Sequence, residues 1–358
     1  MSEQSLLELI KQLQTEFSGM NCTLMEVCGT HTNAIRKAGI HRLLPPGVRL
    51  LSGPGCPVCV TGSNYIEQAV NLSKEPGTIV ATFGDLLKVP GNSETLAESR
   101  AGGGRVRIVY SPLDAVELAK NNPRDRVVFL GVGFETTAPV IALAIQTAKQ
   151  EKVRNFSVLP ALKILRPALE ALLQDPGLSL DGLVAPGHLS VVIGAAAFKF
   201  LPEKYHLPTV ITGFGIGEIW LGLAALLKQI QRAEAKLENM YPRAVAAGGN
   251  TAARKLIGEV FQVEDAEWRG LGLVKKSGFG PAGEYQEYDA RVRFHLPAVP
   301  SKEPPGCLCG MVLLGKKAPE ACPLFDTQCR PDHPVGPCMV SSEGACAAHF
   351  YYRDRGGI

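Results

Sequence analysis

The strongest constraint on the fold is a regular alternation of short β-branched runs with segments of helical character. Most of the runs carry a glycine-bearing turn, and the runs are VRLLSGPGCPVC, GTIVATFGD, RVRIVYSP, RVVFLGVGFETTAP, NFSVLPAL, DGLVAPGHLS and TVITGFGIGE. Helical segments such as 138–149 and 166–173 lie between them. Strands that alternate with helices predict βαβ units and a parallel sheet, so we expect an α/β fold.

The length of 358 residues is too great for one ordinary core. We predict two Rossmann-like parallel-sheet α/β domains, 1–125 (with an N-terminal helix) and 126–240, followed by a C-terminal domain over 241–358. The first boundary is placed where KNNPRDR interrupts the pattern. A long amphipathic helix is expected at 218–239. From Ser301 onward we expect a loop-rich module that builds little core and depends on a metal.

Charge and hydropathy narrow the class of protein. The formal net charge is only +3, and lysines and arginines are scattered, so no nucleic-acid partner is expected. The N-terminus has an acidic residue, Glu3, and no signal-peptide pattern. The most apolar helical stretch, 219–227, is shorter than the roughly 18 residues that span a bilayer. We therefore expect a cytoplasmic protein without a membrane partner.

Ten cysteines are unusual in such a chain, and their distribution is uneven. Four lie in the first 60 residues, none lies between Cys59 and Cys307, and six lie in the last 52. Cytosolic cysteine clusters more often bind metals or act in catalysis than form structural disulfides. The distribution predicts metal or redox chemistry.

Cys28 stands in the segment MEVCGTHT, just before a helix expected at 33–38 with Thr30 or Thr32 as its N-cap. The positive potential at a helix N-terminus lowers a thiol pKa and favours the thiolate. His31 would lie over the same turn and exchange a proton with the sulfur. The alternative is a capped helix beside a cysteine without a role.

Cys56 and Cys59 form a C-x-x-C motif after a predicted strand. In a cytosolic βα setting this motif indicates a dithiol/disulfide couple. Half of a zinc site is the alternative, but such a site needs a second pair nearby.

The C-terminal cysteines outnumber the four ligands of one tetrahedral site. They are Cys307, Cys309, Cys322, Cys329, Cys338 and Cys346. Their wide spacings favour an iron–sulfur cluster over a structural zinc, which usually uses paired knuckles, although zinc stays an alternative.

The glycine turns at 131–136 and 212–217 follow strands, but both depart from the dinucleotide fingerprint. No GxxxxGK[ST] motif occurs in the chain. A nucleotide site is therefore an alternative to turns that simply let helices pack on the sheet.

Several long strings together resemble the HypD family of hydrogenase maturation factors. They are MEVCGTHT, GPGCPVC, FGDLLKVPG, GFETTAP, PGHLS, ITGFGIGE and PVGPCMVSSEGACAA, and they extend from about residue 25 to residue 350. The cysteine spacing of this family, C-x14-C-x6-C-x16-C, is matched in full by Cys307, Cys322, Cys329 and Cys346. The resemblance therefore implies a [4Fe–4S] cluster on these four residues. The resemblance leaves Cys309 and Cys338 as a redox-active pair beside the cluster, as in ferredoxin–thioredoxin reductases.

The resemblance also implies a function, the assembly of the Fe(CN)₂CO group of [NiFe] hydrogenases. Cys28 would be the iron ligand, shared with a HypC-type small chaperone, and HypE would be the cyanide donor. Thiolate is a soft ligand that suits such iron. Because the iron would be shared with a partner protein, we expect Cys28 to be exposed on a loop. His31, Asp85 and Glu343 would be polar helpers, although Asp85 could be an N-cap and Glu343 a surface charge. The alternative function is a thiol–disulfide oxidoreductase acting on a protein disulfide.

Overall fold

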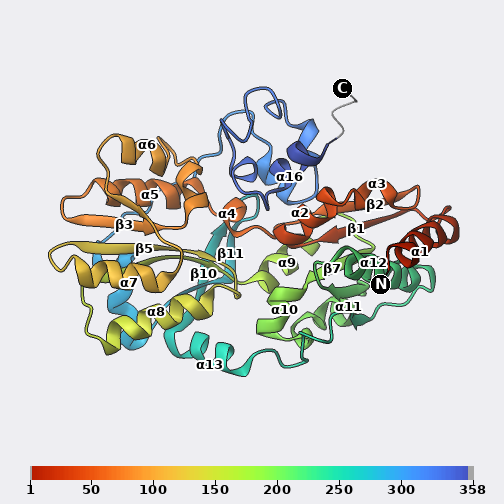
Figure 1. Cartoon of the computed structure of the whole chain (residues 1–358), viewed down its shortest axis with the longest axis horizontal. Coiled ribbons are helices and arrows are strands. Elements are labelled where there is room, and N and C mark those ends of the chain that lie inside the picture. The colour runs from red at the N-terminus through yellow and green to blue at the C-terminus, as the bar shows by residue number, and fades with distance from the viewer. Residues whose placement is uncertain (1, 354–358) are drawn as a thin grey trace.

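Two β-sheets organise the chain, and a computed structural model describes residues 2–353 (Figure 1). The first sheet is entirely parallel, in the order β2 (Val48–Ser52), β1 (Cys22–Glu26), β7 (Gly182–Pro186), β8 (Thr209–Thr212) and β9 (Leu237–Asn239). The second sheet has the order β10 (Phe261–Trp268), β11 (Gly272–Pro281), β6 (Phe156–Lys163), β5 (Arg126–Gly133), β3 (Thr78–Thr82) and β4 (Val106–Ile108). The predicted α/β fold with two parallel-dominated sheets is confirmed.

The helices of the first sheet bury an apolar core against its strands. Leu24, Val184 and Val210 of the strands pack with Trp220 and Leu13 of the flanking helices. The elements of this part are α1 (Glu3–Glu16), α2 (Gly29–Lys37), α3 (Ile40–Leu43), α9 (Leu165–Leu173), α10 (Gly187–Ile193), η2 (Ala195–Phe198), α11 (Phe200–Tyr205) and α12 (Ile216–Gln231). Near-continuous apolar strands are what a parallel sheet covered by helices requires.

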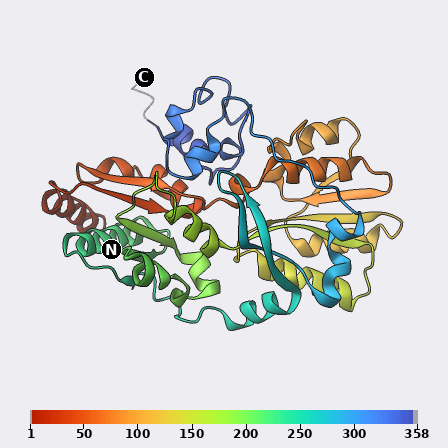
Figure 2. The same ribbon diagram turned by 180° about the vertical axis from the view of Figure 1, so that it is seen from behind.

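The second sheet has its own core, in which Phe129 and Phe156 pack against Ile141 and Ile145. The antiparallel β10–β11 hairpin extends this sheet from β6 and rises toward the C-terminal residues (Figure 2). The helices here are α4 (Pro57–Val60), α5 (Ser63–Lys74), η1 (Gly84–Lys88), α6 (Leu96–Ala101), α7 (Pro112–Asn121), α8 (Ala138–Gln150), α13 (Thr251–Val260), η3 (Gly283–Tyr288) and α14 (Ala290–Arg293).

The sheets divide the chain differently from the expected boundary at residue 125. β1 and β2 share a sheet with β7, β8 and β9, whereas β3 and β4 share the other with β5 and β6. β10 and β11, from the segment expected to be C-terminal, also belong to the second sheet. The strand–helix rhythm specifies each βαβ unit but not which strands become neighbours, because pairing is decided by long-range contacts.

The C-terminal module, residues 301–353, is loop-rich as predicted. Its regular elements are short: α15 (Cys309–Leu313), η4 (Pro319–Ala321), η5 (Pro337–Met339) and α16 (Ala345–Tyr352). It lies above the junction of the two sheets, with α16 against α2 (Figure 1). Cys338, Met339 and Cys346 join one apolar cluster with Val27 and Cys56 of the N-terminal part.

Two helix boundaries differ from the expected ones. The helix after Cys28 begins at Gly29, with Cys28 itself as N-cap, rather than at 33. The helix expected over 218–239 is α12, which ends at Gln231; Ala233 then adopts a left-handed backbone, and the chain continues into β9. Within residues 2–353, no helix combines the length and apolarity needed to cross a bilayer.

Glu135, in the turn GFETTAP after β5, is a buried carboxyl with an incomplete set of partners. The Leu165 N–H donates to its Oε1 at 3.0 Å, and its Oε2 has no partner among residues 2–353. Burial raises the pKa of Glu135 to about 7. The folded protein therefore holds a proton there that the unfolded chain releases near pH 4.3.

We expect this carboxyl to make unfolding pH-dependent. Its contribution to stability is fully present below about pH 4.3 and is lost as the pH rises through about 7, on the order of 3 kcal/mol. Glu135→Gln keeps an acceptor for Leu165 but cannot ionise. Denaturant unfolding of both proteins between pH 5 and 8 should therefore show the wild type losing stability relative to the variant. Parallel pH curves would contradict this assignment.

Candidate functional site

Cys28 lies where β1 meets α2, held by contacts that leave little freedom. Its N–H donates to Glu26 Oε2 at 2.9 Å, and the next N–H, of Gly29, donates to the Gly55 carbonyl at 3.1 Å. A Cβ on Gly55 would lie 2.2 Å from the Cys28 nitrogen, so only glycine allows this approach. The GPGC turn therefore sets the C-x-x-C segment directly beside Cys28.

The expectation of an exposed Cys28 with a lowered pKa is wrong. Cys28 is only 2 % exposed, and burial raises the pKa of its thiol to about 12. A hydrogen bond from the His31 N–H lowers that pKa, but nearby Glu26 and Glu343 raise it. Desolvation of the sulfur outweighs the helix N-terminus, so the free residue is a thiol at neutral pH.

The imidazole beside Cys28 belongs to His188, not to His31. His188 Nδ1 lies 3.8 Å from Cys28 Sγ, and burial lowers the pKa of His188, which keeps it neutral and able to accept a proton. The His31 ring instead contacts the Gly213 carbonyl at 2.9 Å and Thr212 Oγ1 at 3.0 Å. The backbone N–H of His31, rather than its ring, donates a hydrogen bond to the Cys28 sulfur.

Sequence reasoning missed His188 because it is 160 positions from Cys28. The signal was the segment PGHLS directly after β7, since β7 pairs with β1 and parallel strands end at the same edge. Phe214 packs between both imidazoles, with centroid distances of 4.7 Å to His31 and 5.2 Å to His188. Two histidines thus border the site.

Glu343 and Asp85 approach the same region from other elements. Thr30 Oγ1 donates to Glu343 Oε1 at 2.6 Å, and Gly29 lies so close to Glu343 that a Cβ would come within 2.5 Å of its side chain. The Asp85 side chain is exposed to solvent, but desolvation by the surrounding protein raises the pKa of its carboxyl. The nearby carboxylate of Glu343 raises that pKa further. Phe83, not Asp85, is the N-cap of η1, so the capping alternative for Asp85 is wrong.

Cys56 and Cys59 form a disulfide at the start of α4, with a Cα–Cα distance of 5.3 Å. The Cys59 N–H donates to Cys56 Sγ at 3.2 Å, which caps the short helix. Cys59 Sγ also lies 3.9 Å from the carbonyl oxygen of Pro337 in the C-terminal module. The C-x-x-C segment therefore contacts both Cys28 and the residue next to Cys338.

A single cavity gathers all the C-terminal cysteines, with Phe325 and Met339 in its walls. They are Cys307, Cys309, Cys322, Cys329, Cys338 and Cys346. Cys309 exchanges hydrogen bonds with Cys307 and Cys338, and Cys338 also contacts Cys346. Although burial alone would raise the pKa of Cys309, these hydrogen bonds lower it below its usual value. Cys309 and Cys338 are free thiols in this structure.

The donor set of this cavity suits an iron–sulfur cluster. The four cysteines with the C-x14-C-x6-C-x16-C spacing all line it, and the Val335 N–H donates to Cys329 Sγ at 3.3 Å. Hydrogen bonds to cysteine sulfur are a common feature of such clusters. No three His, Cys, Asp or Glu side chains of residues 2–353 form a site for one metal ion. A [4Fe–4S] cluster does not need three side chains to meet at one metal ion, because each cysteine thiolate binds a different iron atom.

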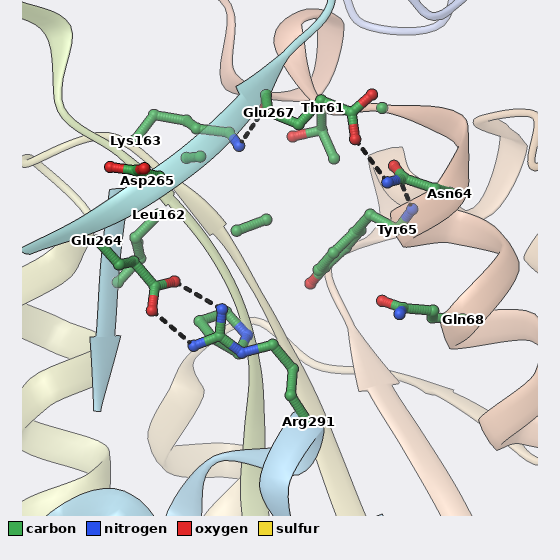
Figure 3. A pocket seen from close by; sticks show the side chains of 14 residues that line it. Thr61, Asn64, Tyr65, Gln68, Leu162, Lys163, Glu264, Asp265, Glu267 and Arg291 are labelled. Atoms are coloured by element: carbon green, nitrogen blue, oxygen red, sulfur yellow. Dashed lines mark hydrogen bonds and ion pairs between the residues drawn. The ribbon is translucent and has the colours of Figure 1, made fainter. Parts of the chain in front are cut away.

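A separate cavity of about 170 Å³, without cysteines in its lining, lies between α5, β10 and α14 (Figure 3). Most of the charged side chains that line it form ion pairs or hydrogen bonds with other lining residues. Arg291 pairs with Glu264 at 2.6 Å, and Lys163 Nζ donates to the Glu267 carbonyl at 2.7 Å. Asn64 Nδ2 donates to Glu267 Oε2 at 2.7 Å. Cys28 and its neighbours therefore remain the candidate site.

Known proteins are similar to this chain over nearly its whole length. The family model for HypD, described as "Hydrogenase formation hypA family", matches residues 2–353. The "Hydrogenase maturation factor HypD" of Escherichia coli K12 is 42 % identical, covering 98 % of this chain and 96 % of its own. The protein of the same name from Azotobacter vinelandii is 44 % identical over 92 % and 89 %. That of Cupriavidus necator is 41 % identical over 93 % and 90 %.

Proposed function

This chain belongs to the HypD family of hydrogenase maturation factors, and we propose that it is the scaffold and redox protein on which the Fe(CN)₂CO group is assembled. Iron, the cargo, binds to the Cys28 thiolate. A HypC-type small chaperone supplies a further ligand, and HypE donates cyanide. A [4Fe–4S] cluster binds to Cys307, Cys322, Cys329 and Cys346, and the remaining cysteine pairs carry electrons.

One observation carries this proposal: the cysteines form a continuous series from the C-terminal cavity to Cys28. Cys309 and Cys338 are hydrogen-bonded to each other and to cluster-spaced cysteines. α15 and η5, which hold this pair, both contact α4. The Cys56–Cys59 disulfide in α4 then adjoins Cys28 through the contact of Gly55 with Gly29.

The chain's own residues prepare Cys28 for a metal. Its thiol must lose a proton to become a ligand, and His188 Nδ1, at 3.8 Å, is placed to accept it. A cation on the sulfur offsets the desolvation that keeps the free thiol protonated. Glu343, which Thr30 holds at 2.6 Å, adds a carboxylate of suitable charge on the side of the C-terminal module.

Electron transfer to this site follows from thiol–disulfide exchange. When bound, the cluster supplies electrons one at a time. The Cys338 thiol passes its proton to Cys309, whose pKa is the lower of the pair, and attacks Cys59, whose sulfur is the nearer to the module. The Cys56 thiolate leaves and takes up that proton. Cys309 then attacks Cys338 and releases Cys59. The net products are a Cys309–Cys338 disulfide and a Cys56/Cys59 dithiol, so electrons balance; two electrons and two protons from an external reductant restore the first pair.

Thiol counting by alkylation and mass spectrometry tests this exchange. In anaerobically purified protein we expect Cys56 and Cys59 to resist alkylation until a mild dithiol reductant is added. In the double variant Cys56→Ser, Cys309→Ser, mild oxidation should trap a Cys59–Cys338 bond, because each resolving thiol is absent.

Cys22→Ser is the matched control, since Cys22 is also buried but lies in β1 away from α4. Full alkylation of Cys56, Cys59, Cys309 and Cys338 in untreated, air-exposed protein would rule out the exchange. A general thiol–disulfide oxidoreductase is not favoured, because it gives no role to a third thiol paired with His188.

A further inference from the structure

Arg269, in the turn between β10 and β11, is a charged side chain inside the molecule, at the end of the hairpin that reaches the C-terminal module (Figure 2). The side chain is only 1 % exposed. It pairs with Glu303 at 2.6 Å and donates to the Thr61 carbonyl at 3.3 Å, whereas its Nε has no partner within residues 2–353. Burying a cation is costly unless anions compensate it, and Glu303 is half exposed. The positive charge of Arg269 therefore acts on the protein around it.

The turn that carries Arg269 lies between the two segments that hold the cysteine pairs. The Arg269 N–H donates to the carbonyl of Val60, the residue that directly follows the C-x-x-C motif, at 2.8 Å. On the other side, a Cβ on Gly270 would lie 2.8 Å from the carbonyl oxygen of Gly310, the residue that directly follows Cys309. Gly270 has a φ of +86°, so both its conformation and this approach require glycine. One dipeptide thus contacts the neighbours of both redox pairs.

The negative charge of the proposed exchange moves between these same two places. It starts on Cys309 in the reduced pair of the module and ends on Cys59, the sulfur released last. A thiolate inside a protein is unfavourable unless a cation lies near it. The charge of Arg269 does reach the Cys309 sulfur: burial raises the pKa of Cys309, its hydrogen bonds with Cys307 and Cys338 lower it, and the charge of Arg269 lowers it further.

We propose that Arg269 is a positioning residue for electron transfer, whose guanidinium is the counter-ion of the thiolate that starts on Cys309 and ends on Cys59. This inference rests on the exchange in the proposed function and adds no chemical step to it. A fixed cation also stabilises the transition state, in which three sulfurs share the charge. The reduced Cys309–Cys338 pair carries a thiolate and its disulfide does not, so Arg269 raises the reduction potential of this pair.

Redox titration of the full-length, anaerobically purified protein in glutathione buffers at neutral pH tests this role. Differential alkylation and mass spectrometry give the fraction of Cys309–Cys338 disulfide at each potential. Arg269→Gln removes the charge and should favour the disulfide about tenfold, which lowers the midpoint by about 30 mV for a two-electron couple. Arg269→Lys keeps the charge without the planar fork and should stay close to the wild type. A merely structural role would move both variants alike.

Glu303→Gln provides a second measurement at a half-exposed position, where the replacement leaves the core intact. It removes the carboxylate that pairs with Arg269, so the midpoint should shift in the opposite direction. The expected change in the equilibrium is about threefold, because solvent and salt screen an exposed charge. Arg291→Gln is the matched control, since Arg291 is a partly buried, ion-paired arginine that lines the cavity without cysteines. It should leave the midpoint unchanged.

A midpoint in Arg269→Gln equal to that of the wild type would overturn this inference alone, as would an equal shift in Arg269→Lys or in Arg291→Gln. Absence of the Cys309–Cys338 disulfide at every potential would overturn it together with the exchange. The assembly function is judged separately, by the iron content and infrared bands of Cys28 variants, which do not depend on this midpoint.

Discussion

Cys322→Ala is expected to abolish the broad visible absorption of the anaerobically purified protein and nearly all of its iron and sulfide. The same result is expected for the other three cysteines with the cluster spacing, Cys307, Cys329 and Cys346. All four line one cavity. A [4Fe–4S] cluster that loses a thiolate ligand in so small a module has no replacement of equal softness, other than Cys309 and Cys338.

The loss should extend to the fold of the C-terminal module. Its longest helix, α16, has eight residues, and its other regular elements have five or fewer. Such short elements bury too little apolar surface to stay ordered alone, so metal binding supplies folding free energy. Hydrogen exchange in residues 301–353 should become fast in the variant while the two sheets remain protected.

Cys309→Ala and Cys338→Ala are the matched controls, because both residues line the same cavity and are also buried. These variants should keep iron, sulfide and visible colour. Full iron and sulfide in a variant of any of the four spaced cysteines would remove that residue from the ligand set.

Cys28→Ala should leave the visible absorption intact and eliminate the infrared bands of bound cyanide and carbon monoxide in the complex with the small chaperone. Cys28 does not line the cysteine cavity of the C-terminal module, so the cluster should remain bound when Cys28 is replaced. The measurement is infrared spectroscopy of the purified complex, with iron counted in parallel.

Cys22→Ala is the control for this prediction, since Cys22 lies in β1, the strand that leads to Cys28, and is similarly buried. His188→Phe should also diminish the bands, because it removes the nitrogen that lies 3.8 Å from the sulfur and accepts its proton. Normal bands in Cys28→Ala would disprove the assignment, and Cys56 or Cys59 would then be the candidate ligand.

The local features of the chain were predictable from its sequence. The β-branched runs and glycine turns specify strands and βα connections, and the C-x-x-C motif specifies two cysteines close enough for the Cys56–Cys59 disulfide. The family resemblance likewise implied a set of four C-terminal cysteines, and these do line one cavity. These features depend on a few neighbouring residues, so a short window of sequence contains the information.

Other features were decided only by the tertiary structure. His188, 160 residues from Cys28 in sequence, lies at the start of α10 and reaches Cys28 because the preceding strand, β7, pairs with β1. Cys28 is a buried thiol because Gly55 and His188, from other segments of the chain, lie against it, and desolvation of its sulfur exceeds the effect of the helix N-terminus. The two sheets also take strands from both sides of the expected boundary at residue 125, for the same reason. Strand pairing and burial arise from contacts between distant segments, and no local pattern of residues contains them.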